Sequence, residues 1–159
     1  MRFLKISEKK FVVLLFISNL ILRLFRLNSP NEAYFDEKIY YLKAARDILA
    51  ARPDSNYPHP PLAKELIGLG IKFFGDNPWG WRTLQAILAS FAVVAVYFIA
   101  KRLFRSRKVA TVASLLMSVE ISWFVLYRVA IPEMFMISFF TFSLFFLIKF
   151  FQEKDNLSL

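Results

Sequence analysis

The chain is organised around one polar interval, residues 28–78, which reads NSPNEAYFDEKIYYLKAARDILAARPDSNYPHPPLAKELIGLGIKFFGDNP. This interval contains the single histidine of the sequence and six of its seven prolines. The segments on both sides of it are mostly apolar. Because long loops in compact domains are uncommon and are usually functional, the interval predicts a site and not a simple connection.

The composition outside the interval indicates a multi-pass membrane protein. Hydrophobic residues make up 57% of the 159 residues, and 19 of them are Phe, whereas soluble domains are about 45–50% apolar. The apolar residues come in four blocks, each long enough to approach a membrane span. We therefore predict an all-α fold, a single membrane domain over residues 1–159, with spans at 11–27, 80–101, 109–127 and 131–151.

The formal charge of +9 predicts a topology and not a nucleic-acid partner, because the cations flank the apolar blocks. One cluster lies in the N-terminal tail, at Arg2, Lys5, Lys9 and Lys10. The other follows the second block, at Lys101, Arg102, Arg105, Arg107 and Lys108. By the positive-inside rule, both termini are predicted to be cytoplasmic in the cell membrane, with residues 28–78 as an extracytoplasmic loop. There is no cysteine, so neither a disulfide nor a thiolate metal site forms.

The first apolar block has two interpretations. A basic start followed by a short apolar run at 11–22 is typical of a secretory signal peptide and also of a first span. No pair of small residues suited to cleavage follows, since the next residues are Arg23-Leu24-Phe25-Arg26-Leu27. We therefore favour an uncleaved span.

Two helices are predicted inside the interval, at about 36–51 and from Pro61 onward. Proline is suited to the first turn of a helix, and the second helix shows an apolar stripe with helical spacing at Leu62, Leu66, Leu69 and Phe73. Its polar side is predicted to comprise Lys64, Glu65, Gly68 and Lys72. Such a helix is expected to lie on the membrane surface.

Ionisable residues of the interval suggest two kinds of chemistry. Asp36 and Glu37 are either a helix cap with its neighbour or a general base that accepts a proton from an attacking hydroxyl. His59 and Lys64 enclose a proline pair at a helix start, a place where phosphate binds well. An ordinary proline-broken loop with a solvated lysine is the alternative.

A second pair of ionisable residues, Arg128 and Glu133, flanks the break between the third and fourth apolar blocks. It is either an interfacial ion pair or part of a site, because charge at such depth is costly unless it is used. The predicted topology places this break on the same outer face as the loop.

The ordered motifs resemble the N-terminal part of the protein O-mannosyltransferases. More broadly they are similar to polyprenyl-phosphate-dependent glycosyltransferases of the multi-span C-type fold. The resemblance rests on Arg23–Leu27, Tyr34–Glu37, His59–Lys64, Trp81-Arg82 and Tyr127-Arg128 with Glu133. The related aminoarabinose transferases usually have Lys before the proline pair, so His59 favours the mannosyltransferase side.

The resemblance implies an inverting transfer of a sugar, mannose or a similar hexose. The donor is a polyprenyl-phosphate sugar, and the acceptor is a hydroxyl of a protein Ser/Thr or of a glycolipid, outside the cytoplasm. Asp36 matches the catalytic base, with Glu37 in support. His59, Lys64 and Arg128 match groups around the donor phosphate, and Glu133 a supporting acid that is commonly Asp. The lipid-phosphate donor is a substrate, no further cofactor is implied, and the metal requirement stays open.

Members of that family have many more spans than the four predicted here. The expectation is therefore a fragment of a longer enzyme, or a chain whose missing spans come from a partner chain. The alternatives are a non-catalytic membrane scaffold, an inactive truncated remnant and a transporter fragment. A transporter would show polar or Gly/Pro breaks at mid-membrane, and the second and fourth blocks show none.

Overall fold

Every regular element of the structure is a helix. The structure is a computed structural model that describes residues 6–157, so the tail cations Arg2 and Lys5 lie outside the described residues. Within this range there is no strand, and the all-α prediction is confirmed. The elements are α1 Glu8–Leu24, the π-helix η1 Glu37–Tyr41, α2 Leu42–Leu49, α3 Pro61–Phe74, α4 Pro78–Phe104, α5 Arg107–Val119, α6 Ile121–Leu126 and α7 Pro132–Leu157.

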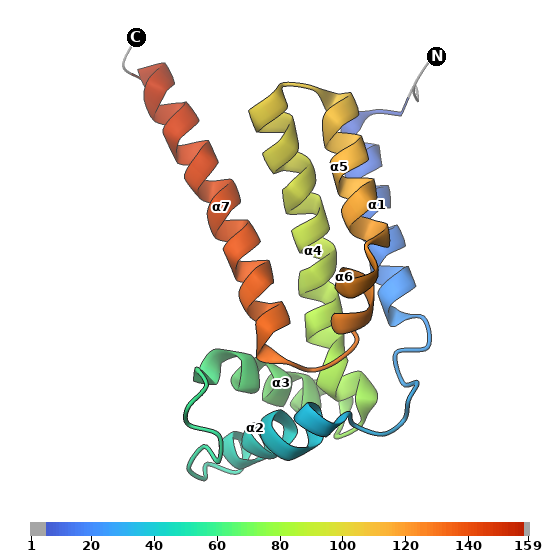
Figure 1. Cartoon of the computed structure of the whole chain (residues 1–159), viewed down its shortest axis with the longest axis vertical. Coiled ribbons are helices and arrows are strands. Elements are labelled where there is room, and N and C mark those ends of the chain that lie inside the picture. The colour runs from blue at the N-terminus through green and yellow to red at the C-terminus, as the bar shows by residue number, and fades with distance from the viewer. Residues whose placement is uncertain (1–5, 158–159) are drawn as a thin grey trace.

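The helices form an upright bundle with a crosspiece at one end. Helices α1, α4, α5 and α7 run along the long axis, while α2 and α3 lie across the end of the bundle where α7 begins (Figure 1). The start of α1, the turn between α4 and α5 and the end of α7 lie at the opposite end (Figure 1). The polar interval and the α6–α7 turn therefore meet at one end of the molecule.

Helix α4 is the central element, and its start is specified locally. Asn77 caps it, because the Asn77 side chain accepts hydrogen bonds from the backbone N–H groups of Trp79 at 2.9 Å and Gly80 at 3.4 Å, and Pro78 occupies the first turn. Two helices are long and apolar enough to cross a membrane, α4 and residues Pro132–Lys154 of α7. In the most apolar stretch of each helix, 61% of the residues of α4 are buried but only 22% of those of α7, so α7 presents most of its surface outward.

The helices at the other two predicted spans are shorter than predicted. Helix α1 has 17 residues, and the block at 109–127 is divided into α5 and α6. The division occurs at Glu120, whose backbone is extended. The Glu120 carboxylate accepts hydrogen bonds from the backbone N–H groups of Ser122 at 3.1 Å and Trp123 at 2.5 Å, so it caps a new helix instead of continuing the first. Membrane crossing at 11–27 and 109–127 stays a prediction.

Helix α3 begins at Pro61 as predicted, but its two faces are assigned differently. Three residues of the predicted apolar stripe are exposed, Leu62 by 51%, Leu69 by 40% and Phe73 by 70%, whereas Leu66 is half-buried against the core. The face toward the protein carries Ala63, Ile67 and Ile71, which pack with Tyr41, Leu42 and Phe135. Lys64 and Gly68 are buried as well, which corrects the prediction that they belong to a polar, solvated side. These residues are buried because α3 packs against α2 and α4. A helical wheel of α3 alone cannot show where those two helices lie.

Two glycines bring α3 and α4 into contact. A Cβ placed on Gly70 would collide with the carbonyl oxygen of Gly80, and a Cβ on Gly80 would collide with that of Gly75. The backbones therefore approach closely where the crosspiece crosses the start of α4. This contact fixes α3 relative to the bundle.

Candidate active site

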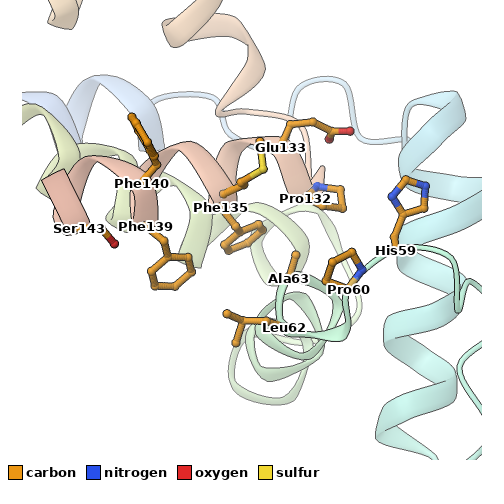
Figure 2. Close-up of a pocket in the computed structure, with 11 residues that line it drawn as sticks. His59, Pro60, Leu62, Ala63, Pro132, Glu133, Phe135, Phe139, Phe140 and Ser143 are labelled. Atoms are coloured by element: carbon orange, nitrogen blue, oxygen red, sulfur yellow. The ribbon is translucent and has the colours of Figure 1, made fainter.

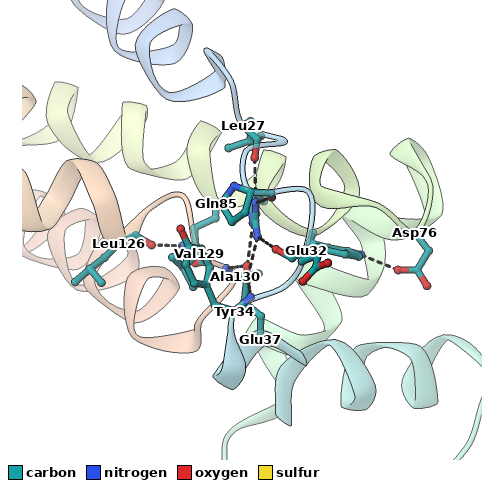
Figure 3. Close-up of polar contacts among 12 residues, drawn as sticks. Leu27, Glu32, Tyr34, Glu37, Asp76, Gln85, Leu126, Val129 and Ala130 are labelled. Atoms are coloured by element: carbon teal, nitrogen blue, oxygen red, sulfur yellow. Dashed lines mark hydrogen bonds and ion pairs between the residues drawn. The ribbon is translucent and has the colours of Figure 1, made fainter. Parts of the chain in front are cut away.

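A buried ion pair between Glu37 and Arg82 lies inside the end of the bundle that α2 and α3 cross (Figure 1). The Arg82 guanidinium donates to both carboxylate oxygens of Glu37, from Nε at 3.0 Å and from Nη2 at 2.9 Å, and neither side chain has exposed surface. Three backbone carbonyls accept the remaining N–H groups at 3.1 Å, those of Leu27, Pro30 and Glu32 (Figure 3). All five guanidinium donors are thus satisfied, and the loop after α1 is fixed around them.

The same carboxylate also connects the loop to the turn before α7. Glu37 accepts a hydrogen bond from the backbone N–H of Tyr34 at 2.8 Å and another from that of Ala130 at 2.6 Å. Gln85, one helical turn beyond Arg82, donates to the carbonyl of Leu126 at 3.1 Å and also to that of Val129 (Figure 3). With four hydrogen bonds and no exposed surface, Glu37 holds the fold together and offers no lone pair to a substrate.

Lys64 has a comparable structural environment. Its ammonium donates to the carboxylate of Asp54 and, at 2.7 Å each, to the backbone carbonyls of Asn56 and His59, with no exposed side-chain surface. Burial pushes the pKa of Asp54 upward, but the hydrogen bonds from Lys64 and from the Asn56 N–H hold it below its ordinary value. All three ammonium donors are used. Lys64 therefore fixes the loop that presents His59, and no N–H remains for a phosphate.

A second group of the predicted residues gathers around Tyr41. Its ring lies edge-on to the His59 imidazole, with the ring centroids 5.7 Å apart. Burial raises the pKa of the Tyr41 phenol, and the carboxylates of Glu133 and Asp36 raise it further. Both acids are therefore within electrostatic range of one buried phenol. Asp36, His59 and Glu133 are exposed, so they form the accessible part of the site.

The local winding of the chain contributes to this arrangement. Residues Glu37–Tyr41 form a π-helical turn, and the N–H of Leu42 donates to the carbonyl of Glu37 five residues earlier. Such turns insert one extra residue and are frequent at functional sites. The turn begins directly after Asp36 and ends at Tyr41.

An apolar groove opens beside His59 and Glu133. It has a volume of about 590 Å³ and lies between the start of α3 and the first half of α7. Figure 2 shows His59 and Glu133 toward one end of the groove and Phe139, Phe140 and Ser143 toward the other. The groove thus runs from two ionisable groups along the outward face of a predicted span.

Arg128 lies in the α6–α7 turn but does not line the groove. Its guanidinium donates to the carbonyl of Arg26 at 2.5 Å and lies over the Phe124 ring at 5.7 Å. The structure therefore places all six predicted residues at one end, with Asp36, His59 and Glu133 accessible, Glu37 and Lys64 buried as anchors, and Arg128 at the side. Among the side chains that the structure describes, residues 6–154, no three His, Asp or Glu gather in a way that could hold a metal ion.

Sequence reasoning gave no role to Arg82 or Tyr41. One signal for Arg82 existed, since it is a lone cation at the start of an uncharged stretch, Thr83–Ala100, and such a charge requires a partner. No pattern in the sequence indicated that this partner is Glu37. Tyr41 was indistinguishable from a core aromatic.

Comparison with known proteins identifies the family. The family model described as dolichyl-phosphate-mannose-protein mannosyltransferase matches residues 58–159. The chain belongs to this mannosyltransferase family. The match includes His59, Lys64, Arg82, Arg128 and Glu133, whereas Asp36 lies before it.

Individual proteins are similar to this mannosyltransferase-family chain over most of its length. A polyprenol-phosphate-mannose–protein mannosyltransferase of Mycolicibacterium smegmatis is 35% identical over 128 residues, which cover 75% of this chain and 25% of that protein. One of the same description from Corynebacterium glutamicum is 36% identical over 98 residues, 62% of this chain and 19% of that protein. An uncharacterised protein of Aquifex aeolicus is 29% identical over 155 residues, 93% of this chain and 31% of that protein. This mannosyltransferase-family chain spans about a quarter of the length of such relatives, and no solved structure matches it significantly.

Proposed function

We propose that this chain carries the base and part of the donor site of a glycosyltransferase. The enzyme moves mannose or a similar hexose from a polyprenyl-phosphate donor to a hydroxyl acceptor, with inversion at the anomeric carbon. The names of its relatives specify polyprenol-phosphate-mannose and protein. The observation that carries the proposal is the position of Asp36, His59 and Glu133 around Tyr41, at the end of a long apolar groove.

The groove suits the donor because a polyprenyl phosphate is an anion at the end of an apolar chain. The isoprenoid part lies against Phe135, Phe139 and Phe140, and the phosphate remains beside His59 at the polar end. Arg128, in the adjoining turn, releases its single carbonyl partner, Arg26, when it turns toward the phosphate. Lys64 acts on the donor through His59, whose carbonyl it holds.

The chemical step requires one base and one leaving group. The Asp36 carboxylate accepts the proton of the acceptor hydroxyl as the hydroxyl oxygen forms a bond to the anomeric carbon. The bond between that carbon and the phosphate oxygen breaks on the opposite face, which inverts the configuration, and its electron pair leaves with the polyprenyl phosphate. Glu133 supports the step as a second carboxylate at the groove, and Glu37 supports it by holding the backbone that carries Asp36.

The membrane orientation is part of the proposal. With both termini cytoplasmic, the crosspiece and the groove end face outward, where lipid-linked sugar and secreted acceptors meet. Cysteines introduced singly at Ser55 and Ser106 can be probed in intact cells with an impermeant thiol reagent. Labelling at position 106 but not at 55 would reverse the topology.

The chemical proposal is tested with Asp36→Asn, which keeps the size of the side chain but removes the base. Membranes containing the chain are assayed for sugar transfer and, separately, for donor-lipid binding. Loss of a general base typically lowers turnover about 10²–10⁴-fold, while donor binding should survive. Glu65→Gln, on the exposed side of α3, is the matched control. Transfer by Asp36→Asn at the unmodified rate would show that Asp36 is not the base, and the acidic pair would then be a helix cap with its neighbour.

A further inference from the structure

A second opening lies against α2. Its walls are mostly polar, whereas those of the groove are mostly apolar. It has a volume of about 400 Å³, and its walls come from the loop after α1, one face of α2 and the start of α4. We call it the polar cleft, and the residues that matter for its chemistry are Asn31, Glu32, Lys38, Leu42, Arg46 and Trp81. None of these residues lines the apolar groove.

The polar cleft and the groove are separated by the helix that Asp36 begins. Lys38, Leu42 and Arg46 recur every four residues, so they share one helical face, and that face lines the cleft. Tyr41 belongs to a different face and contacts His59 beside the groove. Asp36 lies in the chain between Ala33 and Lys38, both of which line the cleft. Asp36 itself lines neither opening, but it is exposed and lies within three residues of two residues that line the cleft.

Three side chains of the polar cleft have donor or acceptor groups that no other described residue uses. Asn31, Glu32 and Lys38 are exposed, and their side chains have no hydrogen-bond or ion-pair partner among residues 6–157. Together they supply an amide, an anion and a cation. Arg46 is different, because Asp76 holds its guanidinium at 2.8 and 3.0 Å.

The aromatic side chain of the polar cleft does not form a sugar platform. Trp81 is only 9% exposed, and the guanidinium groups of Arg46 and Arg82 both lie over its ring at 5.9 Å. Its indole N–H is used as well, by Asp76 at 2.6 Å. Stacking of a carbohydrate ring on Trp81 is therefore excluded by contacts already present.

We propose that the polar cleft binds an extended polypeptide acceptor and holds an acidic side chain of it at Lys38. This inference rests on the proposed function, which it extends by naming where and how the acceptor is held. A polypeptide presents amide N–H and C=O groups to Asn31 and Glu32, whereas a lipid tail would need apolar walls. The loop that supplies Asn31 and Glu32 is preorganised, because Arg82 fixes its carbonyls, which lowers the entropy cost of binding.

The test is a charge swap measured by binding, so it does not depend on turnover. The full chain in lipid nanodiscs is titrated with two fluorescent synthetic peptides that carry one Thr flanked by Asp in the first and by Lys in the second. An exposed ion pair contributes up to about 1 kcal/mol, so Lys38→Glu should weaken the Asp peptide roughly fivefold and strengthen the Lys peptide. Lys43→Glu is the matched control, because Lys43 is exposed on α2 with the same charge but does not line the cleft.

The outcomes separate this inference from the function on which it rests. A preference for the Asp peptide that Lys38→Glu reverses and Lys43→Glu leaves unchanged supports the inference. Equal effects of the two variants, or no binding of either peptide, overturn it, even if Asp36→Asn abolishes transfer. If instead Asp36→Asn transfers sugar normally, the assignment of Asp36 as the base fails, while the charge swap still reports a peptide-binding cleft.

Discussion

Glu37 and Arg82 are 45 residues apart in the sequence, yet they form a two-point ion pair in which neither side chain is exposed. The pair joins the start of η1 to the start of α4, and the Ala130 N–H extends the connection to the turn before α7. Three separate segments therefore depend on one carboxylate. The pair does not contribute an accessible group to the site but determines where the accessible groups lie.

Glu37→Gln should destabilise the chain strongly, because it leaves the Arg82 guanidinium buried without a counter-charge. Removing one partner of a buried ion pair costs about 3–5 kcal/mol. The measurement is the unfolding free energy in detergent micelles. Glu32→Gln is the control in the same loop, since the Glu32 side chain is exposed and unpaired among the described residues. Similar stabilities of the two variants would mean that the buried pair does not hold the loop.

Lys64→Met should release the segment around residues 54–59 without changing the charge at the groove. The ammonium makes three hydrogen bonds there, and a hydrogen bond to a charged group contributes roughly 1.5–3 kcal/mol. Amide hydrogen exchange should become faster at Asn56 and His59, and donor affinity should fall only as a consequence. Lys72→Met, exposed on the same helix, should change neither. Normal exchange at His59 combined with weaker donor binding would favour direct contact between Lys64 and phosphate.

Stability should fall in acid partly through Asp76. Hydrogen bonds from Arg46 and Trp81 lower its pKa against the opposing effect of burial. A carboxyl with a lowered folded-state pKa stabilises the fold above its unfolded value, about 3.9, and this contribution is lost as the pH falls through the folded value. The unfolding temperature of the unmodified chain should therefore exceed that of Asp76→Asn at neutral pH, and the difference should shrink below about pH 4. A constant difference down to pH 2 would exclude ionised Asp76 as the cause.

Ser143→Trp should obstruct the groove at the end away from His59. The side chain is exposed and lines the groove, so a larger ring there takes space from the isoprenoid chain and leaves the phosphate end intact. Binding of a long polyprenyl phosphate should weaken, while a short-chain analogue should bind as before. Leu144→Trp, exposed beside it but outside the groove, is the control. If both chain lengths lose affinity equally, the lipid does not lie along α7.

Local patterns in the sequence predicted the helices well, but they did not predict which side chains contact one another. Pro61 at a helix start and the uncharged run Thr83–Ala100 specify α3 and α4, because capping and hydrophobicity act within a few residues. Lys64 was placed on a solvated face, since a helical wheel treats every cation as exposed and contains no information about α2 or Asp54. The gathering of predicted residues at one end followed from charge placement along the chain.

Long-range geometry accounts for what sequence reasoning missed. The roles of Glu37 and Tyr41 depend on which side chains arrive from α4 and α7, and no spacing rule connects residue 37 to residue 82. The π-helical turn at Glu37–Tyr41 is similarly invisible, because its residues fit an ordinary helix equally well.

The five acceptors around Arg82 also determine an order of assembly. The acceptors all come from residues 27–37, whereas the guanidinium that donates to all of them is on α4. During synthesis the segment 27–37 is made first. It cannot form its hydrogen bonds to Arg82 until the ribosome has added 45 further residues after Glu37. The hydrogen bonds that fix the loop after α1 therefore form only after Arg82 has been made, and the contact of Glu37 with Ala130 forms later still.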